Sequence, residues 1–442
     1  MKILVYSLGL PPFRRGGLVK YSVDLSEQLS ENGNEVTFLY PGHMPFLNSR
    51  KCRFKRRKTH YKFDCFELIN PLPVSLTFGN SINAAAFYSD RSKYEMERFI
   101  SQIAPDVVHL HTIMGLPIQF LEVLKEKNIK IVFTTHDYYG LCPKMLTDNP
   151  LEKLQSSECT YDCMMCNVGP SIDTIKIMQS HLYQTFKNSQ IFKYLRSRQR
   201  DHFKGKEEKY SFNRKQAIER YKLRKYYLNL FSKINYIHFN SSVAEQVFKQ
   251  YLPNVKGKVV PLVINGLKQK ANPKVANDRT TIGFLGGVER KKGFALLSKV
   301  LCELKADGMQ FDVICAGSNA NDKFFDKDYV TNLGIISRNQ VDDFYNHIDV
   351  LVVPSLWHET FGLVVVEAMA NNVPVICSDM VGAKDLIPSD YVFHSKKDLV
   401  IRLKEFISSS TLRGQAFSKF SNLNYDMDFK KHVSLISREF YY

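Results

Sequence analysis

Two glutamates, Glu359 and Glu367, stand eight positions apart around a turn that contains Gly362. The turn follows a predicted buried strand over 349–354 and opens a predicted helix. Such a turn points unpaired backbone N–H groups at one place, beside the positive end of the helix dipole, so an anion can bind there. Ionised carboxylates accept hydrogen bonds and suit the paired hydroxyls of a sugar. A phosphate site beside two such carboxylates predicts a nucleotide sugar as the ligand.

This segment resembles the signature of family four of the retaining glycosyltransferases, which have the GT-B fold. The resemblance implies that Glu359 lies against the donor sugar and that Glu367 binds the ribose. It also implies that the backbone amides of Phe361, Gly362 and Leu363 hold the diphosphate. The alternative is that Glu359 caps a helix and Glu367 is a solvated helix residue.

A pair of glycines, Gly16 and Gly17, stands directly before a predicted helix over 18–31. Without side chains, these residues let a ligand approach the backbone, and a phosphate could bind at the helix start. The G-x-G-x-x-G dinucleotide pattern is absent. The family has a similar pair near the donor diphosphate and the acceptor, although most glycine pairs only form a tight turn.

His136 follows a predicted strand over 130–135, at the end where α/β sheets place ligand-binding residues. The resemblance implies that this histidine contacts the donor sugar. The alternative is a hydrogen-bonded loop histidine without a ligand.

A third loop, around Lys292, carries cationic side chains that could bind the leaving diphosphate. Lys292 aligns with the family lysine that directly precedes a glycine, but the family arginine would fall on Gly287. Arg290 or Arg15 could replace that arginine. A cation is needed because departure of a nucleoside diphosphate builds negative charge, and lysine supplies a point charge rather than a bidentate fork.

Alternating strand and helix patterns predict an α/β protein with two Rossmann-like, doubly wound domains. With the resemblance, we expect the GT-B architecture, in which the domains face each other across a cleft. The expected parts are an N-terminal acceptor domain, 1–266, with a last strand at 258–264 and a basic, cysteine-containing insert at about 142–233; a linker, 267–280; a nucleotide-sugar-binding domain, 281–424; and a terminal helix, 425–442, that crosses back to the first domain.

Composition limits the class of protein. The chain has 442 residues, of which 44% are hydrophobic, enough for two or three ordinary domains. It contains no run of 18 apolar residues, so no membrane span is predicted. The first ten residues read as a buried strand rather than a signal peptide, because Pro11, Pro12, Arg14 and Arg15 follow where a cleavage site would be needed. We therefore expect a cytoplasmic location.

The net charge of +17 is concentrated in two segments. Residues 50–58 hold seven Lys/Arg and no acid, and residues 187–233 hold fifteen Lys/Arg against four acids, interleaved with aromatic side chains. This pattern suits an anionic membrane surface, which would make the protein peripheral on the inner face of the cell membrane. Nucleic acid is the competing partner, but no nucleic-acid motif is present and we expect none to bind. A solvated helical face is the remaining alternative.

Two metal patterns are weak. Asp326-Lys327-Asp328 is a literal D-x-D triplet without supporting context, so we expect no catalytic metal and no required cofactor. Four cysteines within 25 residues could hold a structural zinc ion, or they could be free thiols: Cys142, Cys159, Cys163 and Cys166.

The implied activity is transfer of a hexose, with retention, from a UDP- or GDP-linked sugar. The acceptor would be a glycan or a lipid-linked glycan of a bacterial surface polysaccharide, such as capsule, O-antigen or exopolysaccharide. One alternative is another GT-B enzyme, such as a sugar-nucleotide epimerase. A basic nucleic-acid-binding protein is the alternative from a different class.

Overall fold

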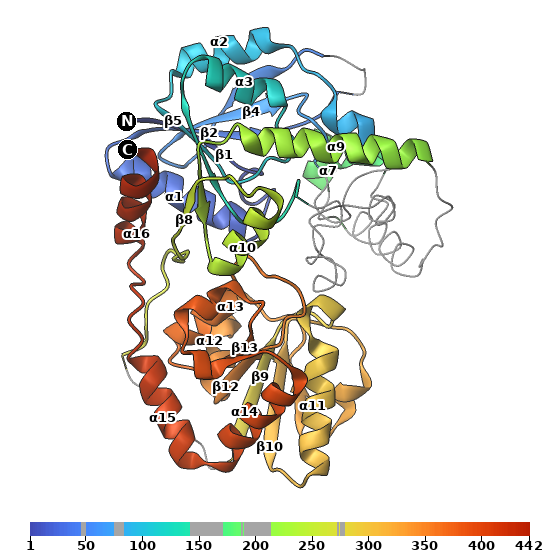
Figure 1. The fold of residues 1–442 in the computed structure, drawn as a ribbon, viewed down its shortest axis with the longest axis vertical. Helices are drawn as coiled ribbons and strands as arrows, with labels where there is room; N and C mark the ends of the chain where they lie inside the picture. Colours follow the sequence, from blue (N-terminus) through green and yellow to red (C-terminus); the bar gives the residue numbers. More distant parts are fainter. Residues whose placement is uncertain are drawn as a thin grey trace.

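The computed structural model describes residues 1–45, 50–74, 84–141, 171–186, 189, 214–271, 274 and 279–442. Within these ranges the chain forms two α/β units, each built on one sheet, with helices on both sides (Figure 1). This is the GT-B arrangement that the sequence predicts. The cysteines proposed for zinc, Cys142, Cys159, Cys163 and Cys166, lie outside the described residues.

The first sheet has the strand order β3-β4-β2-β1-β5-β6-β7-β8 in the described part of the chain. All its neighbouring strands are parallel except β3 and β4, which pair antiparallel at one edge. The central strands are buried along almost their whole length because helices cover both faces, as parallel sheets require. The strands are β1 (Lys2–Tyr6), β2 (Glu35–Pro41), β3 (Arg53–Arg57), β4 (Asp64–Ile69), β5 (Val107–Leu110), β6 (Lys130–Thr134), β7 (Tyr236–Phe239) and β8 (Gly257–Val259).

The helices around this sheet include one at the predicted position after Gly16. The helix α1 (Gly17–Glu31) ends before Gly33, whose positive φ of 84° terminates it. The others are α2 (Lys93–Ile103), α3 (Ile118–Glu126), α6 (Ile172–Met178), α7 (His181–Phe186), α9 (Arg214–Ser232), α10 (Ser242–Tyr251) and the short 3-10 helix η1 (Ala84–Tyr88).

The predicted strand at 258–264 is largely wrong. β8 ends at Val259, and the chain then continues as an irregular segment. Its partner β7 ends at Phe239, whose carbonyl accepts the last ladder bond from Val260, and Pro261 has no N–H to continue pairing. The apolar residues that suggested a strand instead lie beside a cavity between the two units.

The second sheet has the strand order β11-β10-β9-β12-β13-β14, all parallel, in the described residues. Its strands are β9 (Thr280–Leu285), β10 (Phe311–Ala316), β11 (Val330–Asn332), β12 (Val350–Val353), β13 (Val375–Ser378) and β14 (Val392–Phe393). Its helices are α11 (Phe294–Ala306), α12 (Arg338–His347), α13 (Leu363–Ala370), α14 (Lys396–Ser408), α15 (Ser410–Ser421), and the short η2 (Arg290–Lys292), η3 (Lys323–Asp326), η4 (Gly382–Leu386) and η5 (Ser389–Tyr391).

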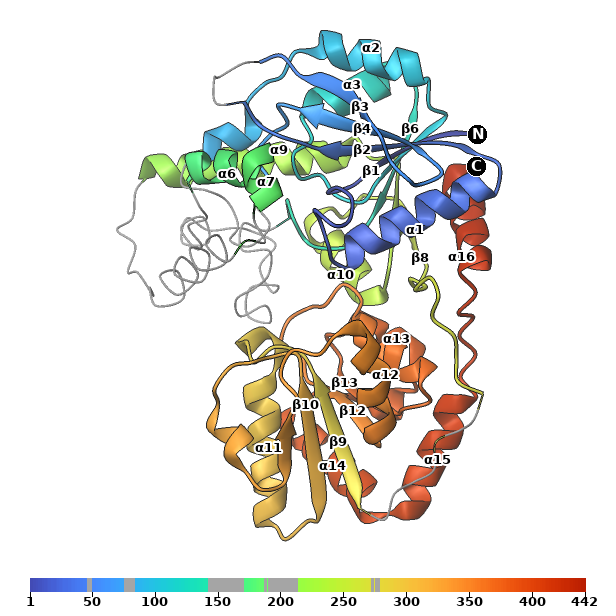
Figure 2. The ribbon, with the colours of Figure 1, turned by 180° about the vertical axis from the view of Figure 1, so that it is seen from behind.

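The C-terminus crosses back to the first unit. An extended segment leads from α15 to α16 (Phe429–Ile436) and the π-helical η6 (Ser437–Tyr441), which lie beside α1 (Figure 2). His432 Nε2 lies 2.8 Å from the Tyr21 hydroxyl, and the Tyr441 hydroxyl lies 2.7 Å from His109 Nδ1. The crossing is as predicted, although the helix begins at Phe429 rather than at residue 425.

Candidate active site

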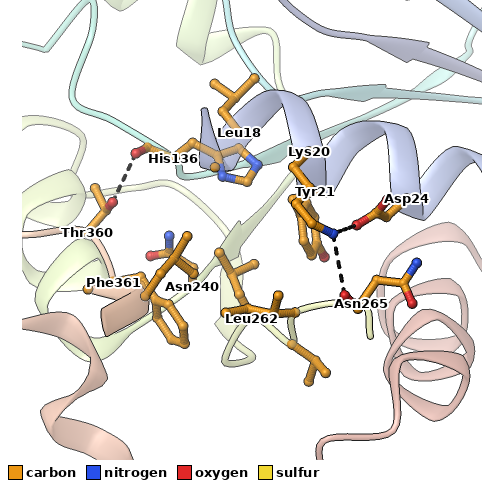
Figure 3. Close-up of a pocket in the computed structure, with 15 residues that line it drawn as sticks. Leu18, Lys20, Tyr21, Asp24, His136, Asn240, Leu262, Asn265, Thr360 and Phe361 are labelled. Carbon is orange, nitrogen blue, oxygen red and sulfur yellow. Dashed lines mark hydrogen bonds and ion pairs between the residues drawn. The ribbon is translucent and has the colours of Figure 1, made fainter. Parts of the chain in front are cut away.

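Two hollows meet at the carboxyl ends of the strands. The first, about 240 Å³, lies between the units, and Figure 3 shows its lining. The second, about 410 Å³, lies in the second unit beside Lys292 and Glu359. Gly362 and Leu363 line both hollows, so a ligand that contacts them can extend into either.

Two helix N-termini face each other at this junction. A Cβ added to Gly17 at the start of α1 would lie 3.0 Å from Leu363 Cδ1 at the start of α13. The N-cap residues, Gly16 and Gly362, have φ of 127° and 98°, and neither supplies a side-chain cap. The first-turn N–H groups of both helices therefore lack the usual capping oxygen, which suits an anionic ligand. Phe361, the first residue of the predicted diphosphate loop, is buried and lines the first hollow.

Glu359 is a nearly buried carboxylate with two defined partners. Its side chain is 6% exposed, and its Oε1 accepts hydrogen bonds from Lys292 Nζ at 2.7 Å and from Ser355 Oγ. Its backbone N–H donates to Met380 O and its carbonyl accepts from Gly382 N, which fixes the loop to the segment after β13. The interpretation of Glu359 as a helix cap is wrong, because Gly362 occupies the N-cap of α13.

Lys292 reaches Glu359 because of the glycine that follows it. Gly293 has φ of 72°, and a Cβ there would collide with the carbonyl of Pro354. Only glycine therefore lets η2 pack so closely against the end of β12. The Lys292 side chain is 34% exposed, so one side of the ammonium remains open to the second hollow.

The other two cations predicted to bind the diphosphate do not lie beside Glu359. Arg290 and Arg15 are exposed and neither lines a hollow. Where the family arginine would stand, at Gly287, the Glu289 carboxylate fills the space that a side chain would enter. Among the three predicted cations, the structure brings only Lys292 to Glu359.

Glu367 lies in the second turn of α13 and faces α12. Its Oε2 accepts a hydrogen bond from the Tyr345 hydroxyl at 3.4 Å, and burial raises the pKa of its carboxyl. Glu367 is partly buried rather than solvated, and it lines neither hollow.

His136 lines the first hollow from the end of β6. Its carbonyl accepts a hydrogen bond of 2.9 Å from Thr360 Oγ1, which links the loops after β6 and β12 across the two units (Figure 3). His111 Nδ1 lies 3.0 Å from His136 Nε2. Burial lowers the pKa of His136 to about 3, so the imidazole is neutral near pH 7.

The sequence motifs did not identify several polar residues of the first hollow. Lys20 Nζ donates to Asp24 and to the carbonyl of Asn265, as Figure 3 shows, and Asn240 lies on the opposite wall. Helical spacing places Lys20 one turn after Gly16, which was the available signal for it. Asn265 directly follows the segment mistaken for a strand. The D-x-D aspartates, Asp326 and Asp328, are exposed and line neither hollow.

Two family models match this chain. The family model "Glycosyltransferase Family 4" matches residues 15–158, and "Glycosyl transferases group 1" matches residues 267–418. An uncharacterised 42.6 kDa protein of the Klebsiella pneumoniae cps region is 22% identical over 90% of this chain and 91% of its own length. The capsular polysaccharide biosynthesis glycosyltransferase CapM of Staphylococcus aureus is 31% identical over 35% of this chain and 40% of its own length. An uncharacterised 41.2 kDa protein of the same Klebsiella region is 29% identical over 27% of this chain and 34% of its own length.

Solved structures share the fold at low identity. Sucrose-phosphate synthase of Thermosynechococcus elongatus superimposes with a TM-score of 0.55 at 14% identity, covering 99% of this chain and 98% of its own. HepE of Anabaena superimposes with a TM-score of 0.52 at 14% identity, covering 99% and 97%. The two family models match separate parts of the chain, one within each α/β unit. Together with the two-sheet architecture, they show that the chain belongs to the group 1 glycosyltransferases of the GT-B fold.

Proposed function

We propose that this protein transfers a sugar from a UDP- or GDP-linked donor, with retention at the anomeric carbon, to a glycan or lipid-linked acceptor of a bacterial surface polysaccharide. The carrying observation is the ion pair between Lys292 and Glu359 beside two hollows that share Gly362 and Leu363. CapM and the cps-region relatives support a role in polysaccharide synthesis. The HepE structure holds UDP and glucose, which supports a nucleotide-sugar donor.

In the proposed reaction, the bond from the anomeric carbon to the phosphate oxygen breaks as the acceptor oxygen bonds to the same face of that carbon. The acceptor proton passes to the leaving phosphate oxygen. Lys292 and the two helix N-termini stabilise the negative charge on the departing diphosphate, so the proposal needs no catalytic divalent ion. Glu359 and His136 orient the sugar, and Glu359 also offsets positive charge at the anomeric carbon. Glu367 would bind the ribose after a rotation away from Tyr345.

The acceptor requires a second surface, and we assign an anionic membrane to it. Near α9, the helices α6 and α7 expose large apolar side chains, with Leu182 73% and Phe186 51% exposed. Lys222 and Lys225 of α9 are exposed as well, as are Arg53 and Lys55 on the edge strand β3. Apolar side chains beside cations match the interface of an anionic bilayer. Among the described residues, no helix is both long and apolar enough to span a membrane.

Vesicle binding tests the two candidate membrane surfaces, which are the helices α6 and α7 near α9 and the edge strand β3. We expect the wild type to co-sediment with phosphatidylglycerol vesicles and not with phosphatidylcholine vesicles. Leu182→Ser/Phe186→Ser should lose binding if the helices dock, and Arg53→Glu/Lys55→Glu should lose it if the edge strand docks. Equal binding to both lipids, or salt-dependent binding to oligonucleotides instead, contradicts the membrane proposal.

The donor is tested by a thermal-shift panel of UDP-, GDP-, ADP- and CMP-sugars. We expect one nucleotide class to stabilise the wild type and to lose most of that effect in Glu367→Ala. A sugar-nucleotide epimerase would convert the donor without an acceptor, whereas a transferase releases the nucleoside diphosphate in proportion to the sugar transferred. Loss of activity in EDTA would contradict the metal-free part of the proposal.

A further inference from the structure

A second histidine, His111, stands behind His136. β5 and β6 are parallel neighbours with Leu110 opposite Phe133, so the residues that follow them meet at the same sheet edge. His111 is 1% exposed, and its Nδ1 lies 3.0 Å from His136 Nε2. The other ring nitrogen of His111, Nε2, is buried and has no hydrogen-bond partner among the residues that the structure describes.

The position of the proton in this pair follows from that unpartnered nitrogen. Burial lowers the pKa of both histidines, so both rings are neutral and each carries one N–H. If His136 donated from Nε2, then His111 would have to carry its proton on Nε2, where the N–H finds no acceptor. A buried N–H without an acceptor is rare in folded proteins. If His111 Nδ1 donates to His136 Nε2 instead, the buried Nε2 of His111 carries only a lone pair and no proton that needs an acceptor.

We propose that His111 is a positioning residue that holds neutral His136 in the tautomer with its proton on Nδ1. His136 then offers its Nδ1–H as a hydrogen-bond donor to the first hollow. There it would bind an oxygen atom of the sugar that the nucleotide carries. The inference rests on the proposed function only in this last step. The tautomer itself is a property of the free protein.

Neighbouring rings hold His111 in place. His109 lies beside it, with ring centroids 4.3 Å apart, and is fixed by hydrogen bonds to Tyr441 and Thr134. The ring of Tyr21 lies 5.8 Å away, nearly edge-on. Tyr441 and His432, which bonds to Tyr21, both lie on the C-terminal helices that return to the first unit. These helices therefore help to hold His111 and His136 in position.

The tautomer is tested by ¹⁵N NMR of imidazole-labelled protein, with the His136 signals assigned by their loss in His136→Gln. We expect the wild-type His136 to carry its proton on Nδ1. His111→Asn keeps an N–H donor close to the position of Nδ1 and should preserve that tautomer, whereas His111→Phe should shift His136 toward the Nε2–H form. A wild-type His136 with its proton on Nε2 overturns the proposal, even if neither His111 variant folds.

Kinetics then separate this role from a merely structural one. His111→Phe should lower kcat/KM for the donor at least tenfold, with His111→Asn recovering most of it. If the tautomer is as expected but His136→Gln binds and uses the donor normally, then the sugar contact is wrong while the positioning of His136 stands. If His111→Phe shifts the tautomer yet retains full kcat/KM, then the positioning has no part in the reaction.

Discussion

The Lys292 ammonium lies 2.7 Å from Oε1 of Glu359, although 66 residues separate the two in the chain and each comes from a different loop of the second sheet. Lys292 bonds to Oε1 of Glu359 and not to Oε2. The Oε2 atom lies 3.4 Å from the position that a Cβ on Gly362 would occupy. A side chain at position 362 would be strained at its positive φ and would collide with Val381 Cγ1, 2.8 Å away, while it would only touch the carboxylate. Ion pair, glycine and helix start form one unit at the junction of the two hollows.

A double-mutant cycle tests this pair. Lys292→Met leaves a nearly buried carboxylate with Ser355 as its remaining side-chain donor, so we expect the free energy of unfolding to fall by about 2 kcal/mol. Glu359→Gln should suppress most of that loss in the double variant, because the amide carries no charge. Urea denaturation measures all four proteins. Strictly additive effects would mean that the ion pair does not form in solution.

Restoring the family arginine should strengthen donor binding. Gly287 does not have positive φ, and the exposed Glu289 carboxylate above it can rotate away, so Gly287→Arg is compatible with the backbone. A guanidinium there would add a bidentate contact to the diphosphate, and we expect the Kd for UDP or GDP to fall about tenfold. Calorimetric titration measures it, with Gly287→Ala as the control. Unchanged affinity in a folded Gly287→Arg protein would place the diphosphate elsewhere.

Three buried histidines make the fold acid-sensitive. Burial lowers the pKa of His136 to about 3, of His238 to about 4 and of His432 to about 3. The unfolded chain binds these protons near pH 6.5, so their stabilisation is complete above that pH and is lost as the pH falls toward 3–4. Each contributes a loss of about 1.4 kcal/mol per pH unit within that window. Burial raises the pKa of Asp137 to about 6, which opposes the trend between pH 6 and about 4, and it also raises the pKa of Glu367. The histidines still outnumber these carboxyl groups, because burial lowers the pKa of His109, His111 and His358 as well.

The measurement is the urea midpoint between pH 7.5 and 5. We expect it to fall steadily below pH 6.5, and His432→Gln should make the decline shallower. A midpoint that stays constant to pH 5 would mean that these rings are accessible to protons in the folded protein.

A contact between the units tests closure of the first hollow. Asp385 of the second unit accepts from the backbone N–H and hydroxyl of Ser242 at the start of α10, both at 2.6 Å. Asp385→Ala should loosen this contact and raise the radius of gyration measured by X-ray scattering, with a cost of about 1 kcal/mol in stability. Asp328→Ala, which removes an exposed aspartate of the same unit, is the matched control. An identical scattering curve for Asp385→Ala would show that other contacts alone hold the units together.

The sequence predicted the two sheets because parallel strands buried on both faces leave an apolar signal that local periodicity cannot hide. It also predicted the change from strand to helix around the glycine of the loop over 359–367. The capping role for Glu359 was wrong because the N-cap position belongs to Gly362, three residues later.

The rest depended on contacts between distant residues. Lys292 meets Glu359 through strand order, and His111 meets His136 through strand adjacency, neither of which is visible locally. The apolar run after Val259 had the composition of a strand, but its neighbour β7 ends at Phe239. Whether Glu367 turns toward a ribose, as the family resemblance implies, depends on a ligand that displaces its bond to Tyr345.

The most direct test is a crystal structure of the protein with the nucleotide sugar that stabilises it most. We predict diphosphate oxygens within hydrogen-bond distance of the Leu363 amide and Lys292 Nζ, with the sugar between Glu359 and His136. A diphosphate bound outside both hollows, or a sugar that touches neither Glu359 nor His136, would contradict the proposed site.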